Sequence, residues 1–198
     1  MGKTERDSLK LIYSKMAKCT KCAISQMDVN KIIDIEKGYG KLKGGGSGHF
    51  VFVSQNPSMY RTPGLEMLAQ DIHAGIIGEL MEMMLDLGLK QEDMMFTNVV
   101  KCSTPENRLP DWGEVLACGD FLFDELIAVN PKVIVAVGQI AQKMFDSTFV
   151  RRSTIHNEIP VMKIWHPSYA VRSGRLTEYH EQLKNVAATC LGGSSGTI

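Results

Sequence analysis

The stretch Lys132-Val-Ile-Val-Ala-Val-Gly138 decides the fold. Its apolar residues follow one another without alternation, which is typical of a strand buried on both faces of a parallel sheet. Three more apolar segments predict strands at residues 49–54, 95–100 and 161–165. Helical spacing of apolar residues predicts helices at 1–18, 75–87, 111–129, 138–145 and 176–190. Strands that alternate with helices in this way predict a three-layer α/β/α fold around a central four-stranded, mainly parallel sheet.

Length and composition favour one globular domain. We expect it to span residues 1–190, with a flexible Gly/Ser tail at 191–198. No apolar run reaches membrane length or resembles a signal peptide, so no membrane partner is expected. The cysteines are too few for a secreted disulfide framework, which predicts an intracellular, cytoplasmic protein in a reducing compartment. No strong self-association motif is present, and a monomer is expected.

Four cysteines have the spacing of a metal-cluster site. Cys19 and Cys22 form a C-x2-C pair, and Cys102 and Cys118 follow much later in the chain. Thiolates favour zinc or an iron–sulfur centre over hard cations. Scattered core cysteines are the alternative, because a free cysteine is often buried and inert. A zinc ribbon fits less well, since ribbons have two short C-x2-C pairs and this chain has one.

Polar clusters follow three of the predicted strands: Ser54-Gln55-Asn56-Pro57, Thr97-Asn98 and His166-Pro167-Ser168. Ligands of parallel sheets bind at the carboxyl ends of the strands. The three clusters therefore predict an active-site crevice at that edge, although Asn98 alone could be a structural cap.

The local charge distribution is more informative than the net charge, which is zero. The segment from Arg151 to Arg175 holds several basic residues against the single acid Glu158. Such a face can bind phosphate even on a neutral protein. On charge alone, a solvated surface is an equally good interpretation.

Several motifs resemble the uracil-DNA glycosylase superfamily, and most closely its iron–sulfur branch, family four. They are Thr97-Asn-Val-Val-Lys-Cys102, Pro105-x-Asn-Arg-x-Pro110 with Glu114, Pro131-Lys-Val-Ile-Val-Ala-Val-Gly138, and His166-Pro-Ser-Tyr169 with Arg172. The resemblance runs from about Tyr13 to Val186. It implies the superfamily's α/β fold, uracil-containing DNA as substrate and a role in base excision repair. It also implies a 4Fe-4S cluster on Cys19, Cys22, Cys102 and Cys118, with Cys190 left as a free thiol.

The resemblance also implies roles for residues at the strand ends. Asn98 would read the uracil edge, because an amide offers both a donor and an acceptor. His166 would stabilise the negative charge that develops on uracil O2. The other expected site residues are Gln55 and Asn56 in catalysis, Ser54 and Tyr60 at the base, and Ser58, Ser168, Tyr169 and Arg172 at the DNA.

One motif departs from family four, whose active site begins Gly-Glu-Ala/Gly-Pro-Gly. The catalytic glutamate aligns with Gln55, and Asn56 resembles the Asn-using branches. Amides can orient a water molecule but carry no charge, which predicts slower turnover. Two alternatives follow. One is a catalytically weak or inactive protein that binds uracil or a modified base in DNA. The other is an enzyme for a different base, with residues 54–60 reshaping the pocket.

Overall fold

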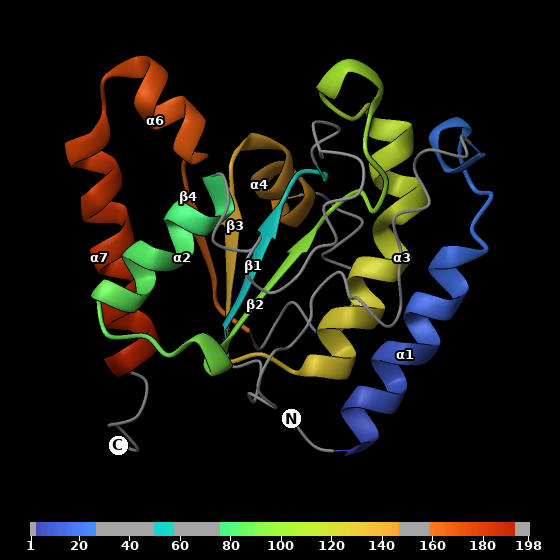
Figure 1. The fold of residues 1–198 in the computed structure, drawn as a ribbon, viewed down its shortest axis with the longest axis horizontal. Coiled ribbons are helices and arrows are strands. Elements are labelled where there is room, and N and C mark those ends of the chain that lie inside the picture. Colours follow the sequence, from blue (N-terminus) through green and yellow to red (C-terminus); the bar gives the residue numbers. More distant parts are fainter. Residues whose placement is uncertain (1–2, 27–49, 58–75, 147–158, 193–198) are drawn as a thin grey trace.

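A computed structural model of the chain describes residues 3–26, 50–57, 76–146 and 159–192 (Figure 1). Its centre is a four-stranded sheet in the order β2-β1-β3-β4. All three neighbouring pairs are parallel, so the predicted fold class is confirmed. The strands are β1 (Phe50–Ser54), β2 (Met94–Asn98), β3 (Val133–Val137) and β4 (Val161–Ile164).

Helices cover both faces of the sheet (Figure 1). Side chains of a strand alternate between its two faces, so each strand feeds two cores. One core lies between the sheet and α1, α3 and α4, and the strands contribute Val51, Val53, Ile134 and Ala136 to it. The other core lies on the opposite face with α2 and α7, and the strands contribute Phe52 and Val135 to it. The helices are α1 (Lys3–Ala17), α2 (Ile76–Asp86), α3 (Trp112–Val129), α4 (Gln139–Asp146), α6 (Pro167–Ser173) and α7 (Leu176–Gly192).

Helix α3 has well-defined ends because local side chains satisfy its free backbone groups. Asp111 caps its first turn by accepting from the Glu114 N–H, and the Glu114 side chain accepts from the Asp111 N–H. This reciprocal capping box fixes where the helix starts. Asn130 ends the helix in the left-handed conformation, with φ of 48°. Short 3-10 turns are η1 (Ala23–Gln26), η4 (Gln91–Asp93) and η5 (Pro105–Asn107).

Two features at the C-terminal end differ from the sequence prediction. Helix α6 was not predicted, because it is short and lies directly after a strand; Pro167 starts it and Gly174, with φ of 68°, ends it. Helix α7 continues through Gly192, so residues 191 and 192 are helical rather than part of a tail. Residues 193–198 lie outside the described residues. Among the described helices, none is both long and apolar enough to cross a membrane.

Candidate active site

The carboxyl ends of β1 and β2 bring the first predicted site residues together. Ser54 is paired with Asn98 in the parallel register. The pairing continues beyond the strands, because the Val99 N–H donates to the Ser54 carbonyl and the Val100 N–H to the Gln55 carbonyl, both at 2.8 Å. Gln55 and Asn98 therefore lie at one edge of the sheet, as predicted. Ser54 is buried and Asn98 is half-buried.

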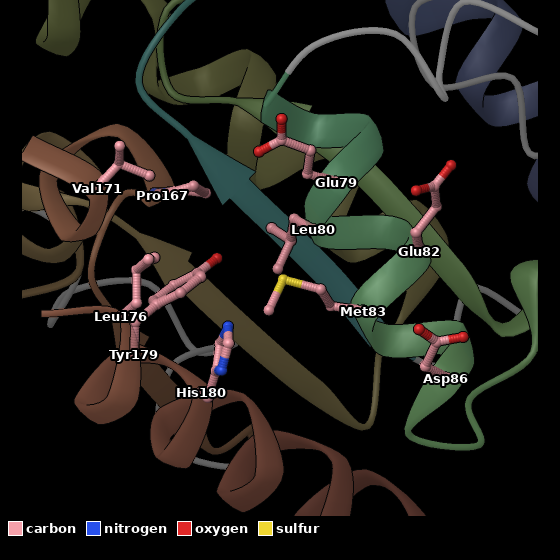
Figure 2. A pocket seen from close by; sticks show the side chains of 10 residues that line it. All are labelled: Glu79, Leu80, Glu82, Met83, Asp86, Pro167, Val171, Leu176, Tyr179 and His180. Carbon is pink, nitrogen blue, oxygen red and sulfur yellow. The ribbon is translucent and has the colours of Figure 1, made fainter.

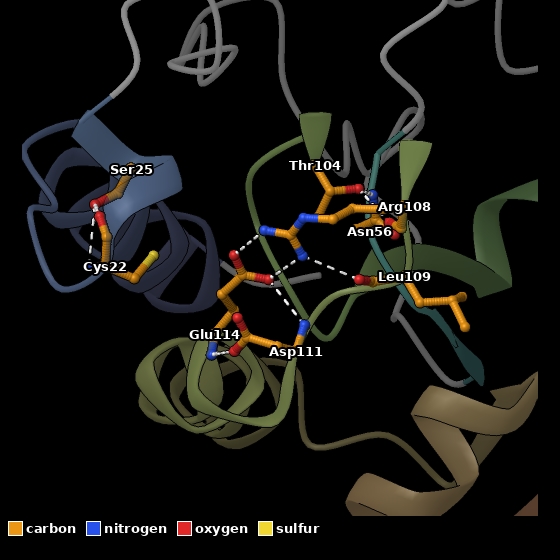
Figure 3. Close-up of polar contacts among 8 residues, drawn as sticks. All are labelled: Cys22, Ser25, Asn56, Thr104, Arg108, Leu109, Asp111 and Glu114. Atoms are coloured by element: carbon orange, nitrogen blue, oxygen red, sulfur yellow. Dashed lines mark hydrogen bonds and ion pairs between the residues drawn. The ribbon is translucent and has the colours of Figure 1, made fainter. Parts of the chain in front are cut away.

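Asn56 is held by its amide nitrogen. Its Nδ2 donates to the Pro57 carbonyl at 3.0 Å and to Thr104 Oγ1 at 3.1 Å (Figure 3). Its Oδ1 is buried and has no hydrogen-bond partner within the described segments. A buried acceptor without a partner is rare in proteins. Asn56 therefore keeps one acceptor at this strand end for which the described residues supply no donor.

A second network ties the loop after β2 to helix α3. The Thr104 hydroxyl donates to the Arg108 carbonyl, and the Arg108 guanidinium forms a two-point ion pair with Glu114 (Figure 3). The hydrogen bond from Arg108 is the main cause of the lowered pKa of Glu114. Bidentate pairs of this kind fix geometry as well as charge. The loop that contacts Asn56 is thus anchored to the capped start of α3.

His166 follows β4 and caps the N-terminus of α6. Its Nδ1 accepts from the Ser168 N–H at 3.3 Å. Burial lowers the pKa of His166, and the nearby Arg172 charge lowers it further. The ring is therefore neutral at neutral pH. Because Nδ1 is an acceptor, the single ring proton is on Nε2, which is left as a hydrogen-bond donor.

Gly138 supports His166 from the end of the neighbouring strand β3. Its φ of +80° favours glycine, and a Cβ built there would lie 3.1 Å from His166 Cβ. The Gly138 N–H also donates to the Ile164 carbonyl at 2.9 Å. Since β2 and β4 are the outer strands, their ends are about 14 Å apart at the usual strand spacing. Asn98 and His166 therefore lie on opposite sides of the sheet's end.

Beyond His166, α6 presents the residues that were predicted to contact DNA. Tyr169 is exposed and packs edge-on against Trp165, with ring centroids 5.5 Å apart. The Arg175 guanidinium lies over the Trp165 ring, 5.5 Å from its centroid. Arg172 is exposed and Ser168 is half-buried. Ser58 and Tyr60, together with Arg151 and Arg152, lie outside the described residues.

The four candidate cluster cysteines gather near the junction of α1 and α3. Cys102 and Cys118 are buried in that core, and Cys19 and Cys22 pack against it. Burial raises the pKa of Cys102 to about 12, with smaller contributions from the other three thiols. Burial also raises the pKa of Cys118. Four thiols within electrostatic reach of one another match the donors of a thiolate-bound cluster.

The turn that carries the first pair is locally ordered. The Cys22 N–H donates to Ser25 Oγ, and the Ser25 hydroxyl donates to the Cys22 carbonyl at 2.6 Å (Figure 3). The Lys21 N–H approaches Cys19 Sγ at 3.5 Å. Within residues 3–26, 50–57, 76–146 and 159–192, no three His, Cys, Asp or Glu side chains are arranged as metal ligands. The donor chemistry fits a cluster, although the side chains are not in a ligating arrangement.

Comparison with known proteins agrees with this geometry. The family model for the uracil DNA glycosylase superfamily matches residues 44–187. The chain belongs to that superfamily. A type-4 uracil-DNA glycosylase of Archaeoglobus fulgidus is 30% identical over 93% of this chain and 94% of its own length. One from Thermotoga maritima is 31% identical over 86% of each chain. The predicted resemblance is therefore confirmed.

A more distant relative of this superfamily member is the DNA polymerase of Bacillus phage SP01. It is 27% identical over 78% of this chain but over only 17% of the polymerase. The similarity therefore concerns one portion of that larger protein.

Sequence reasoning missed a buried ion pair behind the active-site edge of this superfamily member. Lys101 Nζ lies 2.7 Å from Glu125 Oε2, and both side chains are almost fully buried. The available signal was a lysine inside the apolar run Val99-Val100-Lys101-Cys102. A lysine is almost never fully buried unless it is paired.

A groove of about 320 Å³ lies between α2 and the helices α6 and α7 (Figure 2). Its lining includes Glu79, Met83, Pro167, Tyr179 and His180. Of the residues predicted to recognise the base, the two that the structure describes, Ser54 and Asn98, do not line it. The groove adjoins the His166 end of the site through Pro167, which lines it.

The neutral state of His166 can be tested by NMR titration of its imidazole. Burial and Arg172 favour the neutral ring, so the midpoint should fall below 6.5. Arg172→Gln should raise it part of the way, because burial remains. The unfolded chain binds this proton more readily, so His166 should make the free energy of unfolding decrease as pH falls below about 6.5. A midpoint at or above 6.5 would contradict the assignment.

Proposed function

We propose that this protein is a uracil-DNA glycosylase, which extrudes uracil from DNA and hydrolyses its N-glycosidic bond in base excision repair. The observation that carries the proposal is the placement of His166 after β4, where its Nδ1 accepts from the Ser168 N–H and burial lowers its pKa. This arrangement leaves Nε2 as the hydrogen-bond donor. The similarity to proteins named type-4 uracil-DNA glycosylases over most of the chain supports it. A monomeric state and a cytoplasmic location remain predictions from the sequence.

Recognition of the base is assigned to Asn98. Its amide can donate to one group of the uracil edge and accept from another. Within the described segments, no hydrogen bond occupies this side-chain amide, and its neighbours Ser54 and Gln55 form the adjacent strand end. Cytosine presents an amine where uracil presents a carbonyl, so it would leave buried groups unpaired. Such mismatches discriminate strongly between substrates.

Bond cleavage leaves negative charge on the departing base. His166 lies at the same end of the sheet, on the opposite side from Asn98, and would donate its Nε2 proton in a hydrogen bond to uracil O2. A neutral donor stabilises this charge without transferring a proton. Its ring is aimed by the Ser168 N–H and by contact with Gly138.

The attacking water is assigned to Gln55 and Asn56. The Oδ1 of Asn56 can accept a hydrogen bond from this water. Neither amide supplies the negative charge that a carboxylate would place beside the positively charged sugar. We therefore assign these residues to orienting water rather than to electrostatic stabilisation.

Contacts with the DNA are assigned to the helix that follows His166. Arg172 and Ser168 would bind backbone phosphates, which fix the register of the nucleic acid. Tyr169 is exposed and braced by Trp165, so it can occupy space beside the extruded nucleotide. Ser54, Ser58 and Tyr60 complete the proposed lining of the base pocket and its DNA rim.

Cys19, Cys22, Cys102 and Cys118 would hold a 4Fe-4S cluster. When bound, the cluster would join the N-terminal helix to the segment after β2, and metal binding of this type can supply folding free energy. The cysteines themselves sit where these elements already meet, since α1 packs on α3. We assign the cluster a structural role.

The first test is cleavage of a labelled oligonucleotide that contains one uracil, followed by alkali to open abasic sites. Wild-type protein should produce strand scission, and His166→Ala should lower the rate by about 10²–10³-fold. Asn98→Ala should lower it as well. Uracil-dependent binding without scission would instead assign the protein to the base-binding alternative.

Gln55→Glu should raise the single-turnover rate, because a carboxylate would stabilise positive charge on the sugar. Asn56→Asp would also introduce a carboxylate, but the structure separates it from Gln55→Glu. Asn56 Nδ2 donates to Pro57 and Thr104, and an aspartate would lose both bonds. Gln55→Ala is the matched control. A rate in Gln55→Glu below that of the wild type would refute this placement.

Replacing the cluster cysteines should remove iron. Cys102→Ser and Cys22→Ser should lose most of the bound iron and sulfide and the visible absorbance, and should unfold more readily. Cys190→Ser is the control, since Cys190 is buried in the other core with α2 and α7. Iron measurements on purified protein decide the matter. Loss of iron only in Cys190→Ser would contradict the ligand assignment.

A further inference from the structure

The ammonium group of Lys101 has three acceptors, which equals its number of N–H bonds. Nζ lies 2.7 Å from Glu125 Oε2, 3.0 Å from Thr97 Oγ1 and 2.6 Å from the Asn98 carbonyl oxygen. The Thr97 hydroxyl in turn donates to Glu125 Oε2 at 2.7 Å. The network is thus closed on itself, directly behind the residue that is assigned to the base.

This network fixes the peptide unit that follows Asn98. Its carbonyl accepts from Lys101, and its N–H, which belongs to Val99, donates to the Ser54 carbonyl at 2.8 Å. Both polar groups of one peptide plane are therefore held. Lys101, which is paired with Glu125 of α3, holds the carbonyl, and β1 holds the N–H. Rotation about the Cα–C bond of Asn98 would break one of these bonds. The direction of the Asn98 side chain depends on this backbone.

Stability alone does not account for such a pair. The Lys101 and Glu125 side chains are 7% and 3% exposed. Removing two charges from water costs several kcal/mol per ion, and apolar replacements of buried pairs are often neutral or stabilising. A buried pair that contacts the base-reading residue is better explained by the geometry that it imposes.

We propose that Lys101 and Glu125 are positioning residues that fix Asn98 and thereby set the selectivity for uracil. This inference rests on the proposed glycosylase function. The pair does not touch the base. It acts through the Asn98 carbonyl, and Thr97 links the two charges. Lys101 lies within the quoted motif Thr97-Asn-Val-Val-Lys-Cys102, but the sequence assigned no role to it or to Glu125.

The test uses full-length, cluster-loaded protein with the double substitution Lys101→Met and Glu125→Gln, which leaves no buried charge unpaired. We expect the single-turnover rate on uracil to fall about 100-fold, as for a misplaced contact group. KM should change less than about twofold. The ratio of the rate on uracil to the rate on cytosine should also fall. Iron content and melting temperature should stay near wild type. Lys184→Met is the control, because it removes an exposed ion pair with Glu181 and should change none of these quantities.

Hydrogen exchange of residues 94–100 provides a reading that does not depend on activity. Exchange there should rise in the double variant, while exchange in α7 stays unchanged. If the wild type fails to excise uracil, the proposed function is wrong, and exchange still decides the positioning role. Unchanged exchange, or a rate that falls only in proportion to lost stability, overturns the inference.

A second variant covers the case in which the double variant does not fold. Thr97→Val removes the linking hydroxyl and leaves both charges in place. We expect the same changes at smaller size, about fivefold in rate. The two hydrogen bonds of the Thr97 hydroxyl are lost, whereas the bond from Lys101 to the Asn98 carbonyl remains. A wild-type rate together with wild-type exchange in Thr97→Val would count against the proposal.

Discussion

The parallel pairing of β1 with β2, continued past the ends of both strands, is the constraint on which the site depends. Ser54 pairs with Asn98, and two further backbone bonds join residues 54–55 to residues 99–100. A shift of one residue would turn the side chains of β2 to the opposite faces. It would turn Asn98 to the opposite face of the sheet and end its pairing with Ser54. The register is secured because β1 is fully buried and each of its faces has its own apolar core.

The opposite half of the site depends on a different contact, between the ends of β3 and β4. Gly138 leaves β3 with a positive φ and no side chain, which lets His166 approach it closely. Pro167 then begins α6, so the histidine is both the end of a strand and the cap of a helix. This double role explains its fixed ring. The hydrogen bond from the Ser168 N–H to Nδ1 leaves the ring proton on Nε2. Burial lowers the pKa of His166, so that the ring carries a single proton.

Much of this architecture could be predicted from the sequence, because apolar runs such as 132–138 report burial directly. The strand-end positions of Asn98 and His166 followed from the same reasoning. Helix α6 could not be predicted, since its seven residues are too few for a periodic signal and it begins directly after a strand. The Lys101–Glu125 pair joins residues separated by 24 positions. Its existence depends on how α3 is rotated against β2, which local patterns do not encode.

The side chains assigned to the base and to the water are all uncharged: Gln55, Asn56, Asn98 and neutral His166. A carboxylate acts through its charge and tolerates some misalignment, whereas an amide acts through a directed dipole and loses strength as its angle changes. Catalysis with such groups depends more on how firmly each one is aimed. The buried network around Lys101 aims Asn98, Thr104 holds Asn56, and Ser168 with Gly138 aims His166. In this chain the ionic groups lie behind the site, where Lys101–Glu125 and Arg108–Glu114 fix the backbone that presents the neutral ones.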